Sequence, residues 1–508
     1  MTERRLRHDA ASAFGWIAAA KMFERVLGIV RIVVLARVLA PEDFGAFAVA
    51  LLALATLERL SRSGLAIAIV QRKGDVSPYL SAVWSVFVVR GLILAALLFL
   101  SRHLVADFFN APDAGRLIGW VALAVAIAGF ASLSIHLLQR ELRLKARFRV
   151  FAVSGLLDTL VAIPLAIALH DPIALVYGML ARNAALTLGS FVIHPHRPRF
   201  TLNWRPLLDL REFAVQGGLQ SWLFLVVEYG DDAYVGKALG DVALGVYSVV
   251  YRVANILTQE FARVMSEVTL PVFSRVQDDR ERLVRGIRES TGGTAAIVLP
   301  GTLFLVMVAD PFVSVVLGDR WLSGVHAFQI LLAFGLLRAL SQVMESGLVA
   351  RGEIAFVTRV LVIQLVTAAA LVLTLGEAHG LAGVATGIAA SQLISLTLSS
   401  RRLSHGLAVS WTSLFAASRG PLVAAAAAGI AAGGVIVAVS STGSDLLTLF
   451  LGGTVFTGIY VPMALPSIRR DLPMITAVIL DRLPVPAFLR HVRKAPERHQ
   501  DGRPPDSD

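Results

Sequence analysis

Long apolar stretches recur along almost the whole chain, and each is close to the length of a membrane-spanning helix. A helix needs about 20 predominantly apolar residues to cross a bilayer, and only short polar connections separate the stretches here. The sequence therefore predicts an all-α integral membrane protein with about fourteen transmembrane helices. The expected spans are residues 14–39, 43–70, 78–100, 114–138, 149–169, 172–193, 213–239, 243–270, 292–317, 324–350, 354–375, 380–400, 420–440 and 446–465.

Composition favours a membrane protein over a soluble one. Hydrophobic residues make up 56% of the chain and charged residues 16%, whereas soluble domains average about 25% charged residues. The net charge of +11 is explained by basic loops, so we expect no nucleic-acid partner. Cysteine is absent, and the sequence contains neither a G-x-x-x-x-G-K-[ST] nor an H-E-x-x-H motif. We therefore expect no disulfide, no metal and no cofactor.

Basic residues gather in alternate connections between the expected spans. The connections near 139–149, 197–211 and 275–288 are rich in arginine. The intervening connections hold only Arg102, Arg116 and Arg320. Because cytoplasmic loops collect Lys and Arg, this alternation predicts a multi-pass protein of the bacterial inner membrane with both termini in the cytoplasm.

Two segments resemble each other at a constant offset along the chain, 35–57 and 235–257. The aligned positions include Arg37 with Lys237, Gly45 with Gly245 and Phe47 with Tyr247. Six expected helices separate the copies, so both have the same orientation, and the repeat axis runs along the membrane normal. The predicted parts are an N-terminal lobe at 1–194, a cytoplasmic linker at 195–212, a C-terminal lobe at 213–404, two added helices at 405–466 and a partly disordered cytoplasmic tail at 467–508.

Two stretches of about 40 residues resemble the polysaccharide transporter (Wzx-type) flippases of the multidrug/oligosaccharidyl-lipid/polysaccharide exporter superfamily. The first carries Gly28, Arg31, Leu35, Ala36, Arg37, Leu39, Pro41, Asp43, Phe44, Gly45, Gln71 and Arg72, and the second carries Leu239, Gly240, Leu244, Gly245, Val246, Tyr247, Ser248 and Tyr251. The resemblance implies two six-helix lobes arranged in a V and alternating access. It also implies transport of undecaprenyl-diphosphate-linked oligosaccharide units from the cytoplasmic to the periplasmic leaflet, for exopolysaccharide, O-antigen (lipopolysaccharide) or capsule synthesis.

Charged residues inside the first expected helix point to the transport pathway. Lys21, Glu24, Arg25 and Arg31 fall within a sector of about 120° at 100° per residue. Charges at mid-helix usually face a bundle interior or water, and arginine can hold a phosphate group bidentately. We expect this face to bind the substrate diphosphate. The alternative is internal neutralisation, with Glu24 paired to Lys21 or Arg25.

Two further helices carry candidate cavity residues. Arg59 lies near Glu58 and Arg62, which can pair with each other at i,i+4, so Arg59 requires a different partner. Arg252 and Arg263 share one face of the eighth expected helix. We expect Arg59, Arg252 and Arg263 to join the substrate-binding set.

The seventh expected helix carries Glu228, Asp231 and Asp232 without a nearby basic residue. Three carboxylates at membrane depth are not expected all to ionise. Together with Glu24, they are candidates for proton or sodium coupling or for a gate. The alternative is a salt bridge to the charged face of the first helix.

Other functions were weighed against the flippase. A membrane oligosaccharide polymerase needs catalytic groups beyond the outer leaflet, and the short outer connections disfavour it, so we expect no enzyme activity. A cation-coupled drug exporter would favour a carboxylate-lined cavity over a cationic one. Export of a lipid-linked peptidoglycan precursor stays open. Expected partners are the lipid-linked substrate, membrane lipids, a polysaccharide polymerase and a chain-length regulator.

Overall fold

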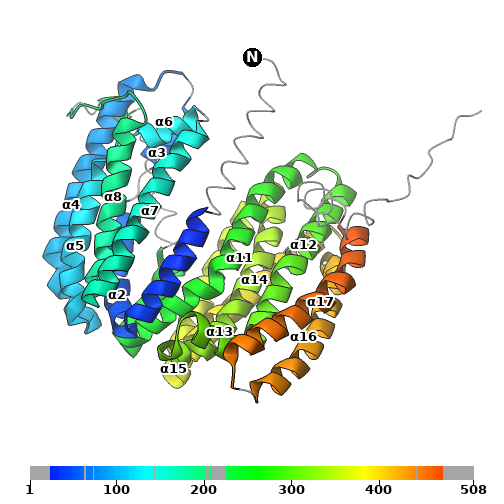
Figure 1. Cartoon of the computed structure of the whole chain (residues 1–508). Helices are drawn as coiled ribbons and strands as arrows, with labels where there is room; N and C mark the ends of the chain where they lie inside the picture. Colours follow the sequence, from blue (N-terminus) through cyan, green and yellow to red (C-terminus); the bar gives the residue numbers. More distant parts are fainter. Residues whose placement is uncertain are drawn as a thin grey trace, which may run out of the picture.

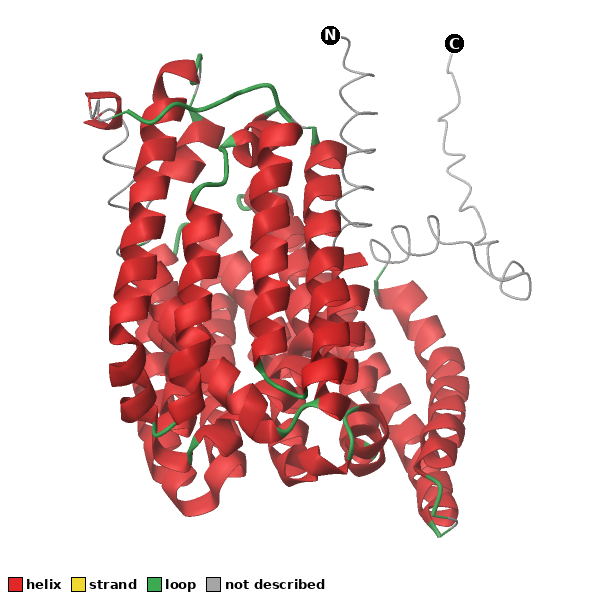
Figure 2. Cartoon of the chain, turned by 60° about the vertical axis from the view of Figure 1, so that its left-hand side comes forward, coloured by secondary structure: helices red, strands yellow, loops and turns green. Residues whose placement is uncertain are grey.

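The computed structural model describes residues 23–61, 64–72, 74–141, 143–201, 205–208, 225–441 and 443–472. Within these ranges the regular secondary structure is entirely helical, as Figure 2 shows. The predicted all-α class is therefore confirmed. Lys21 lies outside the described residues. In the predicted linker at 195–212, residues 202–204 and 209–212 also lie outside them.

The helices form two groups and a C-terminal pair. The first group holds a helix at 23–38, α2 (Pro41–Leu60), α3 (Leu65–Gln71), α4 (Ser77–Phe109), α5 (Pro112–Gly129), α6 (Ser134–Arg140), α7 (Leu144–Leu169) and α8 (Ile173–Val192), with the short α9 (Arg205–Leu208) after it. The second group holds a helix at 225–234, η1 (Val235–Leu239), α11 (Asp241–Arg275), α12 (Arg280–Met307), α13 (Ala309–Val316), η2 (Asp319–Gly324), α14 (Val325–Ala350) and α15 (Ile354–Gly406). After η3 (Trp411–Ser418), the pair consists of α16 (Arg419–Ser440) and α17 (Asp445–Asp471).

Length and hydropathy identify many of these helices as membrane spans. Among the described residues, nine helices are long and apolar enough to cross a bilayer, or ten if the bent pair α2 and α3 is one span. The helix at 23–38 and α11 carry charges and are not among them. The chain is thus a multi-pass membrane protein, while the count of fourteen stays a prediction.

The two groups form a V (Figure 1), in which they meet at one end and diverge at the end where α6 lies. The contact between them is made mainly by α2 and α11, which are the two copies of the sequence repeat. The C-terminal pair α16 and α17 packs against α12 on the outer side of the second group. We retain the predicted lobe limits, 1–194 and 213–404, as a proposal.

Gly45 and Gly245 allow the two repeat copies to touch through their backbones. A Cβ atom at Gly45 would overlap the carbonyl of Asp241, and a Cβ atom at Gly245 would overlap the carbonyl of Pro41. Glycine permits such close backbone approach because it has no side chain. The repeat axis therefore passes close to this crossing, where equivalent residues of both copies meet.

Each copy begins its helix with a different local device. Pro41 occupies the first turn of α2, where its missing N–H would have no intrahelical partner, and the Asp43 carboxylate accepts from the Ala40 N–H at 2.9 Å. In the second copy, Gly240 adopts φ +93° and turns the chain out of η1 into α11. Both devices place a helix start at the joined end of the V.

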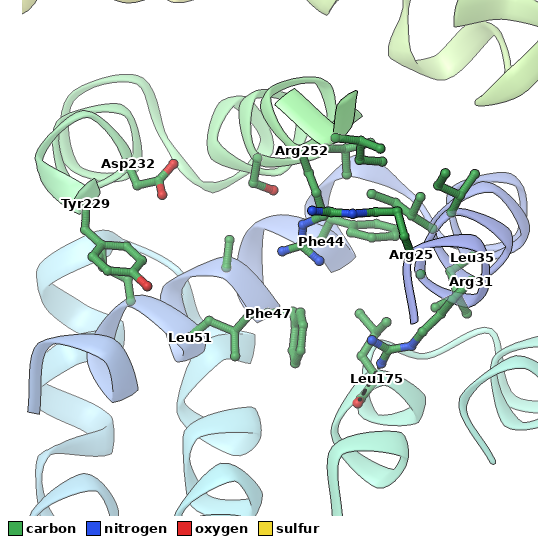
Figure 3. Close-up of a pocket in the computed structure, with 18 of the residues that line it drawn as sticks. Arg25, Arg31, Leu35, Phe44, Phe47, Leu51, Leu175, Tyr229, Asp232 and Arg252 are labelled. Carbon is green, nitrogen blue, oxygen red and sulfur yellow. Dashed lines mark hydrogen bonds between the residues drawn. The ribbon is translucent and has the colours of Figure 1, made fainter. Parts of the chain in front are cut away.

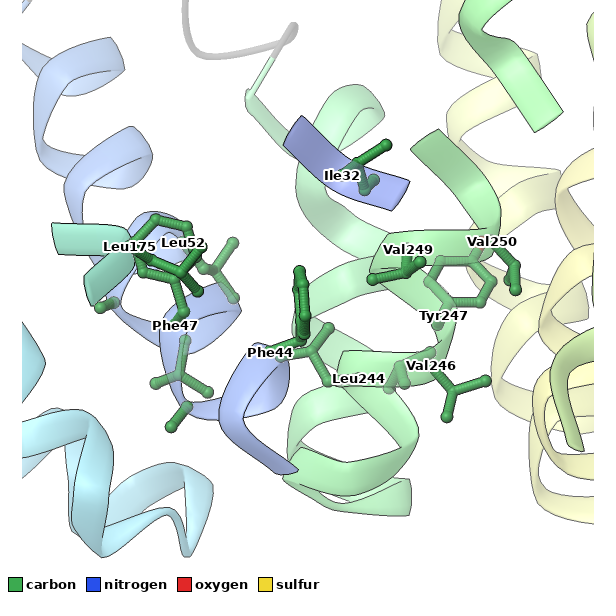
Figure 4. Packing of buried hydrophobic residues seen from close by; sticks show 14 of the residues in the cluster. Ile32, Phe44, Phe47, Leu52, Leu175, Leu244, Val246, Tyr247, Val249 and Val250 are labelled. Atoms are coloured by element: carbon green, nitrogen blue, oxygen red, sulfur yellow. The ribbon is translucent and has the colours of Figure 1, made fainter. Parts of the chain in front are cut away.

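Side chains from both groups seal this joined end. One hydrophobic cluster contains Phe44 and Leu244, which occupy equivalent repeat positions, together with Tyr247 (Figure 4). The fully buried Trp321 donates its indole N–H to the Ala36 carbonyl at 2.9 Å. Lys237 donates to the Phe108 carbonyl at 2.7 Å, and its repeat equivalent Arg37 donates to the Val315 carbonyl in the opposite group. Arg37 and Lys237, the aligned basic pair of the repeat, thus each bond to the opposite helical group.

Several predicted spans are interrupted in the structure. The span at 43–70 divides into α2 and α3, whose axes differ by 58°. The span at 292–317 breaks at Val308, where Pro311 cannot donate the hydrogen bond that would continue α12 into α13. Hydropathy alone does not register these two breaks. By contrast, the spans at 354–375 and 380–400 were predicted separately, and they are the two arms of α15, which reverse direction at Gly380 (φ +58°).

Candidate functional site

A cavity of about 460 Å³ lies between the two helical groups and is lined by charged residues from both. We call it the arginine cavity, and Figure 3 shows its lining. The helix at 23–38 supplies Glu24, Arg25 and Arg31, and the second group supplies Asp232 and Arg252. Every described residue predicted for the charged face of the first helix thus lines the cavity.

A second cavity of about 900 Å³ adjoins the first and extends into the second group. The two share Arg25, Tyr229, Asp232, Ser248, Arg252 and Ile256 in their linings, so they adjoin one another at these residues. The remaining predicted residues that the structure describes, Arg59, Glu228 and Asp231, line this second cavity. The side chain of the predicted residue Arg263 lies outside the described part of the chain.

Arg25 and Arg252 come from opposite groups and point toward one another in the arginine cavity (Figure 3). Arg252 is exposed to the cavity and forms no hydrogen bond or ion pair with another residue in the described ranges. Two guanidinium groups that converge from different helices offer several N–H donors in fork geometry, which suits the oxygens of a phosphate group.

Arg31 is bound within the first group. Its guanidinium forms an ion pair with Asp158 of α7 at 3.0 Å and donates to the Leu175 carbonyl of α8 at 3.5 Å. The Asp158 side chain is 8% exposed, and Gly178 leaves room for it, because a Cβ there would collide with the carboxylate. Arg31 therefore ties the first helix to α7 and α8.

Breaking this buried pair should lower the stability of the first group. We expect Arg31→Met to cost about 3–5 kcal/mol, because it leaves a buried carboxylate without its counter-charge. The double variant Arg31→Met, Asp158→Leu should recover most of that loss, since apolar residues of similar volume replace the pair. Thermal unfolding of the purified protein measures both. A double variant as unstable as Arg31→Met alone would contradict the assignment of Arg31 to this pair.

The carboxylates of the helix at 225–234 have three different environments. Glu228 forms an ion pair with Arg59 of α2, across the two groups. Asp231 accepts a hydrogen bond from the Tyr247 hydroxyl at 2.8 Å. Asp232 lines both cavities, and its carboxylate has no hydrogen bond or ion pair to any residue that the structure describes. The ion pair that Glu228 forms across the two groups is therefore made with α2, rather than with the first helix as the alternative had it.

Sequence reasoning missed a polar region of the second cavity. Its lining includes Arg338 and Glu345 from α14 and Gln364 and Gln392 from α15. Arg338 and Glu345 are seven residues apart, which places them on one helix face, and this spacing was a usable signal. The two glutamines come from opposite arms of α15, and only the reversal at Gly380 brings them together.

The long apolar helices define this chain as a multi-pass membrane protein, and the charged cavity lies between its two joined helical groups. The chain belongs to the polysaccharide biosynthesis protein family, whose model matches residues 34–326, more than half of the sequence. The resemblance to the Wzx-type flippases is thereby confirmed.

Individual relatives agree with this membership. The lipopolysaccharide biosynthesis protein WzxC of Escherichia coli (strain K12) is 26% identical over 403 residues, covering 78% of this chain and 80% of WzxC. The succinoglycan biosynthesis transport protein ExoT of Rhizobium meliloti (strain 1021) is 26% identical over 309 residues, covering 60% of this chain and 62% of ExoT. The lipid II flippase MurJ, in an inward closed conformation, shares the fold with a TM-score of 0.71 at 15% identity, covering 89% of this chain and 98% of MurJ.

Proposed function

We propose that this protein is a flippase that moves undecaprenyl-diphosphate-linked oligosaccharide units across the membrane for surface polysaccharide synthesis. The observation that carries the proposal is the arginine cavity, in which Arg25 and Arg252 converge from the two helical groups. A diphosphate is the part of such a substrate that must leave the headgroup region, and its charge is costly to place in hydrocarbon. Paired guanidinium groups offset that cost by charge-assisted hydrogen bonds.

The membrane orientation follows from the arginine-rich connections. The V opens at the end where α6 lies, next to Arg140 and Arg143, and basic loops face the cytoplasm. The structure then corresponds to a state open toward the cytoplasm and closed toward the periplasm of a bacterial inner membrane. Substrate enters between the groups, and opening of the seal around Trp321 releases it to the periplasmic leaflet. With this orientation, the proposal has both chain termini in the cytoplasm.

The proposal assigns no catalytic residue, because translocation requires binding and conformational change without covalent chemistry. The names of WzxC and ExoT support a polysaccharide substrate. A lipid-linked peptidoglycan precursor, the substrate class that the MurJ name suggests, is the second candidate. A polysaccharide polymerase and a chain-length regulator are the proposed partners, since they act on the same product. The two candidate substrates differ in the sugars that the lipid diphosphate carries.

Deleting the gene in its native host tests the proposal. We expect surface polysaccharide to be lost and the lipid-linked oligosaccharide to accumulate, with its sugar inaccessible to reagents added outside the cytoplasmic membrane. Unchanged surface polysaccharide, together with accumulation of a lipid-linked muropeptide, would favour the peptidoglycan precursor instead. Unchanged levels of both would contradict a flippase function.

We further propose that the carboxylates of the helix at 225–234 couple transport to protons or sodium. Asp232 lines both cavities and Asp231 lines the second, so a bound cation there would change the charge met by the substrate. We expect Asp231→Asn, Asp232→Asn and Glu228→Gln to alter the pH or sodium dependence of transport, measured as polysaccharide output. Asp445→Asn, at the start of the distant α17, serves as the control. Unchanged dependence in all three variants would refute coupling at this helix.

A further inference from the structure

The second cavity ends in a pocket lined by uncharged polar side chains. They are Ser341 and Gln342 from α14, Gln364 from the first arm of α15, and Ser391 and Gln392 from the second arm. We call these residues the amide chamber. The chamber lies in the second helical group, and none of its residues lines the arginine cavity.

Hydrogen bonds fix the amides of the chamber in place. Gln364 donates to the Gln392 amide oxygen at 2.9 Å, and Gln392 donates to the Ser341 hydroxyl at 2.8 Å. This relay connects α14 with both arms of α15. Gln392 is 4% exposed, whereas Gln364 is half-buried and lines the cavity. The Gln364 amide oxygen accepts no hydrogen bond from any described residue. The Gln364 amide is thus fixed by its N–H donor, and its oxygen can accept a hydrogen bond from a ligand in the cavity.

Aromatic rings line the same cavity beside the amides. The rings of Tyr251 and Phe334 lie 6.3 Å apart between centroids, and both residues belong to the cavity lining. Arg338 and Glu345 add one charge of each sign. Sugar rings have hydroxyl edges that need donors and acceptors and apolar C–H faces that pack on aromatic rings. An isoprenoid chain would instead leave the amides without partners, which is unfavourable.

We propose that the amide chamber binds the sugar rings of the lipid-linked substrate while Arg25 and Arg252 hold its diphosphate. This inference rests on the proposed flippase function and assigns glycan recognition to α14 and α15. The two cavities share six lining residues, so a ligand whose diphosphate lies in the first can reach the second with its sugars. Because held amides discriminate between hydroxyl patterns, the chamber selects which oligosaccharide is transported. Gln364 is the specificity-determining residue, and Gln392 is a positioning residue that holds the Gln364 amide.

Binding to the purified full-length protein in nanodiscs separates the two subsites. The probes are undecaprenyl diphosphate and the same lipid diphosphate carrying N-acetylglucosamine or glucose. The variants are Gln364→Leu and Gln392→Leu. Gln329→Leu is the matched control, because Gln329 lies on α14 and bonds the Val306 carbonyl away from the cavity. Thermal unfolding checks that Gln392→Leu stays folded, and Gln364→Leu is the milder change because its side chain is only half-buried.

The wild type should bind at least one sugar-bearing probe about tenfold more tightly than undecaprenyl diphosphate. Gln364→Leu and Gln392→Leu should lose that difference and keep undecaprenyl diphosphate binding, whereas Gln329→Leu keeps both. Equal affinity of the wild type for all three probes would overturn the proposed sugar site. The same holds if both variants keep the full difference in affinity between the sugar-bearing probe and undecaprenyl diphosphate. If no probe binds the wild type, the flippase proposal itself fails, and the chamber fails with it.

Discussion

Gly45→Val is expected to open the cavity to the periplasmic side. A valine side chain at this position would occupy the place of the Asp241 carbonyl, so α2 and α11 cannot cross as they do in the structure. Overpacking typically costs about 1–3 kcal/mol and more where backbone must move. A shift of about 2.8 kcal/mol changes a two-state population about 100-fold, since each 1.4 kcal/mol is tenfold. The closed state at the joined end of the V should therefore lose most of its population.

Thiol labelling measures this shift, because the chain contains no native cysteine. Ser248→Cys places one thiol in the lining of both cavities. In intact spheroplasts, a membrane-impermeant maleimide should label this thiol at least tenfold faster in the Gly45→Val background. Gly458→Val is the control, since space around Gly458 is open. Gly45→Ala should give an intermediate rate. Equal labelling rates in all folded variants would show that the crossing does not close the cavity.

The charge reversal Arg25→Glu, Arg252→Glu is expected to abolish transport while the protein remains in the membrane. Both guanidinium groups line the arginine cavity, and each would lose a charge-assisted hydrogen bond worth about 1.5–3 kcal/mol. The new carboxylates would in addition repel a diphosphate. We expect polysaccharide output to fall by at least about 100-fold. Quantifying surface polysaccharide together with membrane protein level in the deletion host gives the measurement.

A matched reversal outside the cavity separates this effect from a general change in charge. Arg282 is 72% exposed and pairs with Asp279 at the start of α12, an ion pair of small energetic value. Arg282→Glu should therefore transport normally. Normal polysaccharide output from a stably expressed Arg25→Glu, Arg252→Glu variant would refute the diphosphate site.

The sequence predicted the parts of the site that lie on single helices. Charges at membrane depth are costly, so Arg25 on the first helix and Arg252 on the eighth were informative in isolation. The structure places both in one cavity. The repeat was equally informative, because Gly45 and Gly245 are equivalent in sequence and in contact in space. Helical periodicity and burial cost suffice for inferences of this kind.

The missing parts depend on pairing between distant segments. Arg31 was expected to bind substrate, but its ion pair with Asp158 requires knowledge that α7 packs beside the first helix. The amide chamber requires the reversal of α15 at Gly380 and its packing on α14. Gln364 and Gln392 are uncharged, so the cost of a charge at membrane depth does not single them out. The periodicity of a single helix cannot predict which residues of three different helical segments come into contact.

Transport in reconstituted vesicles tests the central claim most directly. Vesicles with and without the purified protein receive undecaprenyl-diphosphate-linked N-acetylglucosamine and glucose probes in the outer leaflet, and the fraction accessible to an impermeant periodate reagent is followed over time. The flippase account predicts that the wild type moves at least one sugar-bearing probe to the inner leaflet and that Arg25→Glu, Arg252→Glu does not. No movement by the wild type, or equal movement by the variant, would contradict it.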